Sequence, residues 1–467
     1  MPLGVFRTWV KNVDTGVFPD TRRHFSVLRC NHCANAPCVA ICPTKAMYQR
    51  PDGLVDFDSE RCIGCKACMQ GCPYDAIHID PATDTAAKCN FCSHRVDEGL
   101  LPACVVVCPV EALVFGDKND PASRVSQLLS QKPVKVRRPE QKTAPHAFYI
   151  GAHDTALDPL APDDTGMLAW ADRKNPSPHA SADPSVRLTY DIPKSRPWGA
   201  KVSAYIWTKS IAAGAAMVPA ILHGSGFHSN EPVFSRDAPA IALIFLTLTS
   251  ILLIWDLKRP ERFWMILVHP QWKSWLARGA VVLTAFGALL AVWAWSLWND
   301  VDWLTDALAW PVVGIAILAA IYTAFLFAQC EGRDLWQSKL MPFHFALHAF
   351  IAGAAVLLAI GSASAMLQLR PFAPWLALAL GMSAALAMID GFGRHPTENA
   401  RAAARHMTHG RGASLFWMAL ILGMIVPAIH FLFIPSLFKL AAVMTLAFGL
   451  FGYSHALVNA GQRPPIS

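Results

Sequence analysis

Charged side chains are scarce in this sequence of 467 residues. Asp, Glu, Lys and Arg make up only 16% of it, whereas hydrophobic residues make up 54%. Ordinary soluble proteins carry roughly 25% charged residues. The composition therefore argues against a disordered chain, a collagen-like chain and a highly charged nucleic-acid-binding protein.

Cysteine is nearly absent outside one region, and tryptophan is nearly absent from that region. Twelve of the 13 cysteines lie between Cys30 and Cys108, and 14 of the 16 tryptophans lie at or after Trp198. An apolar run of the length found in secretory signals is missing after the pair Arg22-Arg23, so we expect no such signal there. One half of the chain is rich in thiols, and the other half is apolar and aromatic.

The sequence divides into a cysteine-rich part (1–116), a proline-rich part (117–197), an apolar part (198–458) and a tail (459–467). The second part contains 11 prolines and few apolar runs, which predicts an extended linker. Eight stretches of the apolar part have about the 20 residues needed to cross a bilayer. They are 202–224, 237–256, 277–298, 310–329, 344–367, 372–390, 413–432 and 435–458. We therefore predict an all-α polytopic bundle of eight helices within the lipid bilayer.

Tryptophans gather near the predicted helix ends, where an aromatic belt would lie. These are Trp255, Trp264, Trp298, Trp310, Trp336 and Trp375.

The cysteines form three groups that share one ending. The groups read CNHCANAPCVAICP, CIGCKACMQGCP and CNFCSHRVDEGLLPACVVVCP, and each ends in C-x3-C-P. Their cysteines are Cys30, Cys33, Cys38 and Cys42; Cys62, Cys65, Cys68 and Cys72; and Cys89, Cys92, Cys104 and Cys108. The second group matches the C-x2-C-x2-C-x3-C-P run of bacterial ferredoxins, which predicts [4Fe–4S] clusters. Zinc sites and disulfides are the alternatives, and neither explains the repeated ending.

Residues 1–116 resemble the iron–sulfur subunits of complex molybdenum enzymes, such as polysulfide, dimethyl sulfoxide and nitrate reductases and formate dehydrogenase. The resemblance implies an α+β ferredoxin-like fold. It also implies that Cys30, Cys33 and Cys38 share a cluster with Cys72, and that Cys62, Cys65 and Cys68 share one with Cys42.

The third cysteine group has no complete ligand set by this resemblance. In the family it pairs with an earlier cysteine group, whereas Met1 here begins in what resembles the segment after that group. We therefore expect two clusters with assigned ligands and a third whose ligands stay open. Codons upstream of Met1 or a partner protein are the expected sources of the missing group.

Residues 198–458 resemble the NrfD and polysulfide-reductase family of membrane anchors. The segments PWGAKVSAYIWTKSIAAG and DLKRPERFW carry the resemblance. It implies eight helices and no haem. Ligation of haem by two histidines would need pairs at matching depth in the bundle. The candidates scatter over both faces: His223, His344, His348, His430 and His455.

A quinone needs hydrogen-bond partners and a proton route within the membrane. Polar groups are costly there, so each is a functional hypothesis. Tyr205 and Lys209 share one face of the first helix at i, i+4 spacing, and Tyr322 on the fourth helix has a similar depth. Asp256, Arg259, Glu331 and His348 lie near the same end of their helices. The alternatives are that Lys209 reaches the interface, Tyr322 belongs to the belt, and the Asp256–Arg259 pair only anchors the second helix.

These features predict an electron-transfer and membrane-anchor subunit of a molybdopterin oxidoreductase, which exchanges electrons with the quinone pool and works with a separate catalytic subunit. One alternative is a subunit of a quinol-oxidising respiratory complex that delivers electrons to cytochromes. Another is a redox-coupled ion translocator. No nucleic-acid partner is expected.

The basic residues predict an orientation in a bacterial-type inner membrane. Fifteen lie in the segments at the end of the bundle that adjoins the iron–sulfur domain, whereas the opposite loops hold Arg236, Arg370 and Lys439. Because an excess of Lys and Arg in short loops marks the cytoplasmic side, we predict that the iron–sulfur domain faces the cytoplasm.

Overall fold

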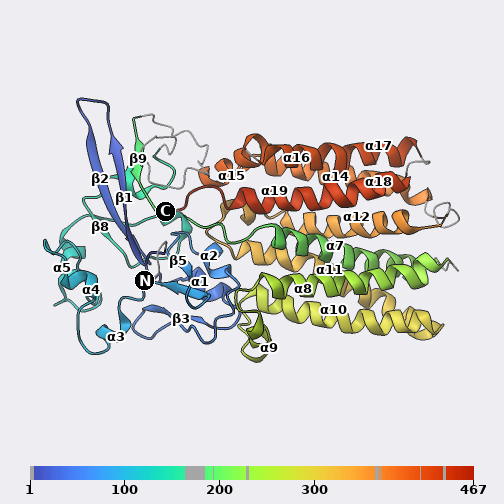
Figure 1. The fold of residues 1–467 in the computed structure, drawn as a ribbon, viewed down its shortest axis with the longest axis horizontal. Coiled ribbons are helices and arrows are strands. Elements are labelled where there is room, and N and C mark those ends of the chain that lie inside the picture. The colour runs from blue at the N-terminus through green and yellow to red at the C-terminus, as the bar shows by residue number, and fades with distance from the viewer. Residues whose placement is uncertain are drawn as a thin grey trace. The chain divides into compact units, whose positions relative to one another are not determined.

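The chain forms two compact units, shown in the computed structural model of Figure 1. One comprises Met1–Ser195 with Pro465–Ser467, and the other comprises Arg196–Pro464. The structure describes residues 5–162, 185–192, 194–227, 231–362, 368, 370–410, 412–434 and 438–467.

The first unit repeats a short helix followed by a β-hairpin. Helices α1 (Pro37–Ile41) and α2 (Ala67–Gly71) lead into Cys42-Pro43 and Cys72-Pro73. The backbone at both cysteines is extended, because the proline ring disfavours a helical conformation of the preceding residue. The hairpins are β3 (Met47–Gln49) with β4 (Val55–Phe57), and β5 (Ile77–Asp80) with β6 (Thr85–Lys88). This repeat of helices and strands confirms the predicted α+β ferredoxin-like class.

A separate three-stranded antiparallel sheet has the order β2-β1-β9. Its strands are β1 (Thr8–Thr15), β2 (Arg22–Arg29) and β9 (Arg187–Tyr190). The remaining elements are α3 (Ser93–Val96), α4 (Ala103–Val106), α5 (Arg124–Gln131), β7 (Val134–Lys135), β8 (Tyr149–Ile150) and α6 (Asp154–Leu157).

The predicted linker at 117–197 contains folded elements in its described part. It supplies α5, α6, β7, β8 and β9, and Arg137 and Thr143 are each 1% exposed. The hydroxyl groups of Tyr74 and Thr143 share a hydrogen bond of 2.6 Å, and the N–H of Ala34 donates to the carbonyl of Ala144 at 2.9 Å. Prolines suit such extended segments, so a high proline content did not prevent them from packing. Residues 163–184 and 193 lie outside the described residues.

The described residues of the second unit include eight helices that are long and apolar enough to cross a membrane. This agrees with the prediction. The spans are Ala200–Gly224, Val233–Asp256, Trp275–Trp298, Asp302–Ala328, Met341–Ile360, Arg370–Phe392, Ala413–Phe433 and Lys439–Gly461. Their regular helices are α7 (Ala200–Gly224), α8 (Ala238–Asp256), α10 (Trp275–Trp298), α11 (Asp302–Ala328), α12 (Met341–Ile360), α14 (Ala373–Phe392), α16 (Ala413–Leu420), α17 (Val426–Phe433), α18 (Phe438–Met444) and α19 (Phe451–Gly461). Helix α7 is the most buried span and packs against α8, α11, α12 and α19.

Two helix ends differ from the sequence prediction by more than four residues. The fourth span begins at Asp302 rather than at 310, with Pro311 inside it. Proline breaks the hydrogen-bond pattern of a helix, but neighbouring transmembrane helices can compensate for the loss. The fifth span ends at Ile360, and most of the predicted residues beyond it, 363–367, lie outside the described part of the chain.

Two short helices lie outside the spans. Helix α9 (Met265–Val268) follows the second span, and α15 (Glu398–His409) joins the sixth to the seventh. The side chain of Thr397 caps α15 by accepting a hydrogen bond from the N–H of Ala400 at 3.1 Å. The membrane prediction missed α15 because its apolar residues are mostly alanine, which gives no long apolar run.

The predicted aromatic belt holds for five of the six tryptophans, which are between 46% and 64% exposed in the isolated chain. Trp336 is the exception, because it is fully buried. Its ring stacks on Phe327 at 4.7 Å and on Trp198 at 5.7 Å, and its Nε1 donates to the carbonyl of Leu457 at 3.1 Å. Trp336 is therefore part of the core of the bundle.

Helices α7 and α12 cross at Gly214 and Gly353, two residues without a side chain. A methyl group added to Gly214 would lie 1.9 Å from the carbonyl oxygen of Ala349, and one added to Gly353 would lie 2.1 Å from that of Gly214. Small residues of this kind let transmembrane helices approach closely.

We expect Gly214→Ala to destabilise the membrane unit. The added methyl group would collide with the backbone of α12, which cannot move aside as a flexible side chain can. Overpacking of this kind costs about 1–3 kcal/mol. The matched control is Gly381→Ala on α14, where an added methyl group meets no atom within 4 Å. Thermal unfolding in detergent should show a lower midpoint for the first variant only, and equal midpoints would contradict the close crossing.

Candidate iron–sulfur and quinone sites

The structure brings Cys30, Cys33 and Cys38 together with Cys72. Burial raises the pKa of the Cys38 thiol, and Cys72, Cys30 and Cys33 raise it further by electrostatic repulsion. The same repulsion, from Cys30 and Cys33, acts on Cys72. The four thiols therefore lie within electrostatic reach of one another.

A second set consists of Cys42, Cys62, Cys65 and Cys68, which line one cavity. The N–H of Met47 donates to Sγ of Cys42, and the N–H of Ala86 donates to Sγ of Cys62, both at 3.4 Å. Hydrogen bonds to the ligand sulfurs are one of the ways in which proteins tune iron–sulfur clusters.

The packing of α1 against α2 explains why each set mixes two sequence groups. A methyl group added to Gly71 of α2 would lie 3.3 Å from the side chain of Ile41 on α1. Helix α1 leads from the first cysteine group to Cys42, which lies in the second set. Helix α2 leads from the second cysteine group to Cys72, which belongs to the first set. The last cysteine of each C-x3-C-P ending therefore joins the opposite set.

Each set has the four thiols that a [4Fe–4S] cluster takes as ligands. Within the described residues, no three His, Cys, Asp or Glu side chains are placed to hold a single metal ion. Four cysteines that line one cavity, as the second set does, are the donor set of a cubane, in which each thiolate reaches a different iron.

The third group is more open. Cys89, Cys92, Cys104 and Cys108 are all partly exposed, although the first eight ligand candidates are buried apart from Cys65. Nη1 of Arg29 lies 3.4 Å from Sγ of Cys104. The structure does not assign this group a complete ligand set.

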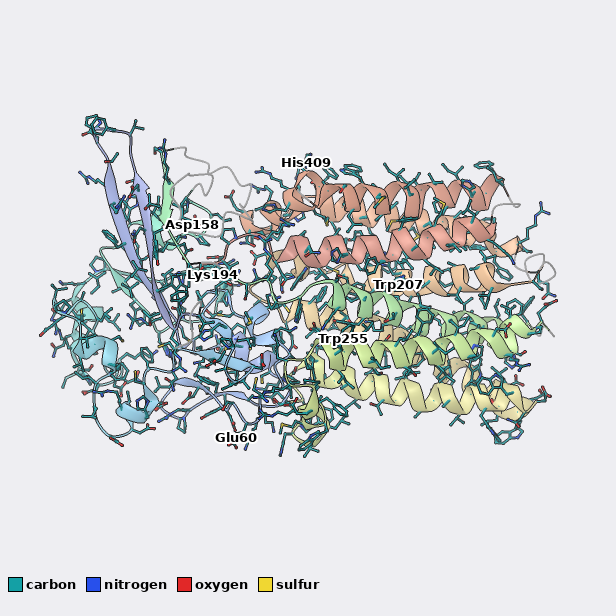
Figure 2. The ribbon with its side chains drawn as sticks, in the orientation of Figure 1. Glu60, Asp158, Lys194, Trp207, Trp255 and His409 are labelled. Atoms are coloured by element: carbon teal, nitrogen blue, oxygen red, sulfur yellow. The ribbon has the colours of Figure 1, made fainter. Side chains whose placement is uncertain are left out.

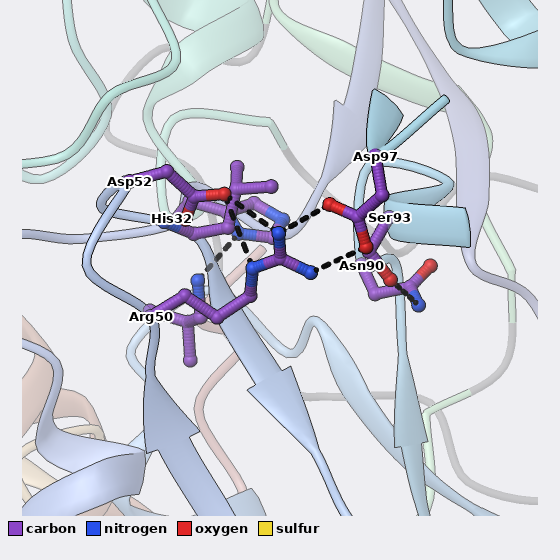
Figure 3. Close-up of polar contacts among 8 residues, drawn as sticks. His32, Arg50, Asp52, Asn90, Ser93 and Asp97 are labelled. Atoms are coloured by element: carbon purple, nitrogen blue, oxygen red, sulfur yellow. Dashed lines mark hydrogen bonds and ion pairs between the residues drawn. The ribbon is translucent and has the colours of Figure 1, made fainter. Parts of the chain in front are cut away.

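Polar contacts attach the third group to the β3–β4 hairpin, as Figure 3 shows. Arg50, which follows β3, pairs with Asp52 at 3.0 Å and forms a two-pronged ion pair with Asp97, which follows α3. The hydrogen bond from Arg50 lowers the pKa of Asp97. The ring of His32 stacks on Phe91 at 4.2 Å. These contacts hold the loop of Cys89 and Cys92 beside the loop of Cys30 and Cys33.

Lys88 places a buried cation between the cysteine groups. Its side chain is fully buried, and Nζ donates to the carbonyl of Val55 and, at 3.1 Å, to that of Cys89. Burial is the largest influence on the pKa of the Cys30 thiol and raises it, whereas the charge of Lys88 lowers it. A buried cation favours the extra electron of a reduced cluster.

We therefore expect Lys88→Gln to lower the reduction potential of the cluster that Cys30 serves. Removing a unit charge several ångströms away should shift the potential by about 50–100 mV at an effective dielectric constant near 20. Redox titration followed by electron paramagnetic resonance would measure the shift. Lys132→Gln, which alters an exposed lysine, is the control, and equal potentials in all three proteins would contradict this role.

In the membrane unit, Lys209 points into the bundle rather than toward the interface. Its side chain is 1% exposed. Nζ donates to the carbonyl of Ala320 at 2.9 Å and to the hydroxyl group of Thr323, and it lies 4.3 Å from the centre of the Tyr322 ring. The structure thus brings Lys209 and Tyr322 together.

Of the other residues predicted for the quinone site, Tyr205 interacts with the Lys209–Tyr322 pair, whereas Arg259 and Glu331 have other surroundings. The Tyr205 hydroxyl group interacts with Thr323 and, electrostatically, with Tyr322 and Asp256. Arg259 instead pairs with Glu261 at 3.3 Å. Glu331 is half-buried just after α11, and burial raises its pKa. Gly279 on α10 makes room for Tyr322, because an added methyl group would lie 2.3 Å from its ring.

His348 belongs to a second polar group, which the sequence analysis did not recognise. Tyr453 on α19 donates to Asp390 on α14 at 2.5 Å and lies 3.3 Å from Nδ1 of His344 on α12. The rings of His344 and His348 are 4.4 Å apart, and Nε2 of His348 lies 3.0 Å from the hydroxyl group of Ser383. All five side chains are buried. Three separate helices contribute to the group, so no local pattern could reveal it.

Comparisons with known proteins agree with this division. The model of the 4Fe-4S dicluster domain matches residues 22–118, and that of polysulphide reductase, NrfD, matches residues 190–462. A subunit of tetrathionate reductase from Salmonella typhimurium is 46% identical over 34% of this sequence and 65% of its own length. A component of polysulfide reductase from Wolinella succinogenes is 40% identical over 32% of this sequence and 80% of its own. The arsenate respiratory reductase iron-sulfur subunit ArrB of a Shewanella species is 37% identical over 30% of this sequence and 82% of its own length.

The chain spans about two thirds of the length of the first of these relatives, and each match covers about a third of this sequence. The NrfD match covers more than half of this sequence, and the matched residues include all eight apolar helices. The chain therefore belongs to the NrfD family of polysulphide reductase membrane proteins, with an iron–sulfur electron-transfer domain fused to the membrane anchor.

Proposed function

We propose that this chain passes electrons between [4Fe–4S] clusters and the membrane quinone pool, as a subunit of a molybdopterin oxidoreductase. The buried ammonium group of Lys209 carries the quinone part of the proposal. A cation within a membrane bundle is costly and marks a functional site. The relatives are named as parts of tetrathionate, polysulfide and arsenate reductases, which supports a separate catalytic partner.

The cysteine sets fit two cubanes, Cys30, Cys33, Cys38 and Cys72 for one and Cys42, Cys62, Cys65 and Cys68 for the other. Such clusters supply one-electron transfer when bound. The backbone N–H groups of Met47 and Ala86 would stabilise the negative charge on their sulfur ligands. The third cysteine group would hold a further cluster once its ligand set is completed.

The quinone ring would bind beside Lys209 and Tyr322. Nζ of Lys209 would turn one hydrogen bond from Ala320 or Thr323 toward a quinone oxygen, which gains negative charge on reduction. Donors already in place for developing charge are an efficient form of stabilisation. The hydroxyl groups of Tyr205 and Tyr322 would complete the polar side of the site, and Asp256, Arg259 and Glu331 would lie toward its outer end.

Full reduction of a quinone takes two electrons and two protons, so the site needs a proton supply. The buried group of Asp390, Tyr453, His344 and His348 offers titratable side chains in sequence from the end of α14 into the bundle. We assign it the role of proton route. Asp390→Asn should then slow quinone reduction more at high pH than at low pH.

We also propose that the iron–sulfur unit lies in the cytoplasm. A carboxy-terminal alkaline phosphatase fusion should be inactive and a fluorescent protein fusion bright. The reverse pattern would place the unit in the periplasm.

The proposed assembly can be tested by purifying the tagged chain from its native membrane. A second large subunit containing molybdenum or tungsten with pterin should co-purify, and the complex should oxidise or reduce a quinone analogue. A complex that contains cytochromes and no pterin would contradict the assignment.

A further inference from the structure

A hollow of about 530 Å³ lies where the sixth span meets helix α15. Its lining carries five basic side chains and no acidic one: Arg394, His395, Arg401, Arg405 and His409. Three of them follow one face of α15 at i, i+4 and i+8, which places them in a row. Figure 2 labels His409 at the end of this row.

The charge of this hollow is little compensated by neighbouring carboxylates. Arg401 pairs with the exposed Glu398 at 3.1 Å, and Asp390 is already bound by Tyr453. Among the described residues, no acidic side chain pairs with Arg394 or Arg405. Nε2 of His395 is buried and makes no hydrogen bond in the same part of the chain. Like charges gathered in this way repel one another unless an anion joins them.

The surroundings of the hollow suit a lipid. Phe392 and Ala404 contribute an apolar part to its lining, and the ring of Phe392 lies 5.9 Å from that of Trp417 at the start of the seventh span. The hollow therefore lies at the end of two membrane-spanning segments, at the level where phosphate headgroups lie. A free anion would use the basic side chains but would leave the apolar part uncovered.

We propose that this hollow is a binding site for the phosphate group of an anionic phospholipid. The arginines Arg394 and Arg405 bind the phosphate, His395 donates a further hydrogen bond when protonated, and an acyl chain covers Phe392. The site is separate from the Lys209 site, and it does not rest on the proposed quinone chemistry.

The test compares the full chain with the double variant Arg394→Gln/Arg405→Gln. Both are stripped of lipid and placed in phosphatidylcholine nanodiscs, alone or with phosphatidylglycerol or cardiolipin. Native mass spectrometry should show anionic lipid retained by the parent protein. The variant should bind it about 30-fold more weakly, because each basic residue near a membrane surface contributes about fivefold.

The matched control is Arg370→Gln/Lys439→Gln, which removes the same charge at the opposite ends of the spans. The control should retain the lipid, and Arg405→Lys, which keeps the charge, should lose little affinity. Equal retention by the double variant, or equal retention of phosphatidylcholine, would overturn the site. Displacement of the lipid by millimolar inorganic phosphate would overturn the lipid assignment and leave a site for a free anion.

Discussion

Replacing Cys42 with alanine should remove the same cluster as replacing Cys62, although 20 positions separate the two residues. Replacing Cys38, only four positions from Cys42, should remove the other cluster. The reason is that α1 carries Cys42 away from its own group and into the cavity lined by Cys62, Cys65 and Cys68. Each single variant should lose about four iron atoms per chain.

The distinction is measurable by electron paramagnetic resonance of the reduced protein. The Cys42→Ala and Cys62→Ala spectra should lack the same signal, and the Cys38→Ala and Cys72→Ala spectra should lack the other. Cys330→Ala is the control, because this buried thiol lies in the membrane unit and contacts the carbonyl of Leu326 at 3.4 Å. Identical losses in Cys38→Ala and Cys42→Ala would contradict the grouping.

Replacing Lys209 with methionine should slow electron exchange with quinone by about a hundredfold or more, by analogy with the loss of one preorganised donor in other enzymes. The iron content should not change, because Lys209 lies in the other unit. Tyr322→Phe keeps the ring beside Lys209 and removes only its hydroxyl group, so it separates packing from hydrogen bonding.

Lys201→Met is the matched control for Lys209→Met. Lys201 lies on the same helix, but its ammonium group donates to the carbonyl of Trp255 at the exposed end. Rates of quinol oxidation by the purified chain should fall for Lys209→Met and remain near the parent value for Lys201→Met. Equal rates would move the quinone site elsewhere, with Asp256 and Glu331 the next residues to test.

The sequence predicted the parts of this protein that short-range patterns encode. Cysteine spacing indicated iron–sulfur clusters, and runs of about 20 apolar residues indicated eight spans, because both features are local. The grouping of Lys209 with Tyr322 also followed from depth along two helices. The contact between Lys209 and Thr323 could not be predicted in this way, because threonine is common in membrane helices and carries no distinguishing pattern.

Features that depend on tertiary packing were missed or misjudged. The buried group of Asp390, Tyr453 and His344 joins three helices, and nothing near any one residue predicts the others. Trp336 has the sequence position of a belt residue, yet it stacks on both Trp198 and Phe327. The proline-rich segment was predicted to be an extended linker, but Arg137 and Thr143 are buried by contacts with distant parts of the first unit.

The most direct test of the account is rapid-mixing spectroscopy of the isolated chain without any catalytic partner. The clusters are first reduced with dithionite under anaerobic conditions, and a quinone analogue is then added. We expect the visible absorption of oxidised clusters to return in the parent protein, with matching formation of quinol, and Lys209→Met to slow both changes greatly. Clusters that stay reduced in the parent protein, or that reoxidise equally fast in Lys209→Met, would contradict the claim that this chain connects iron–sulfur clusters to quinone through Lys209.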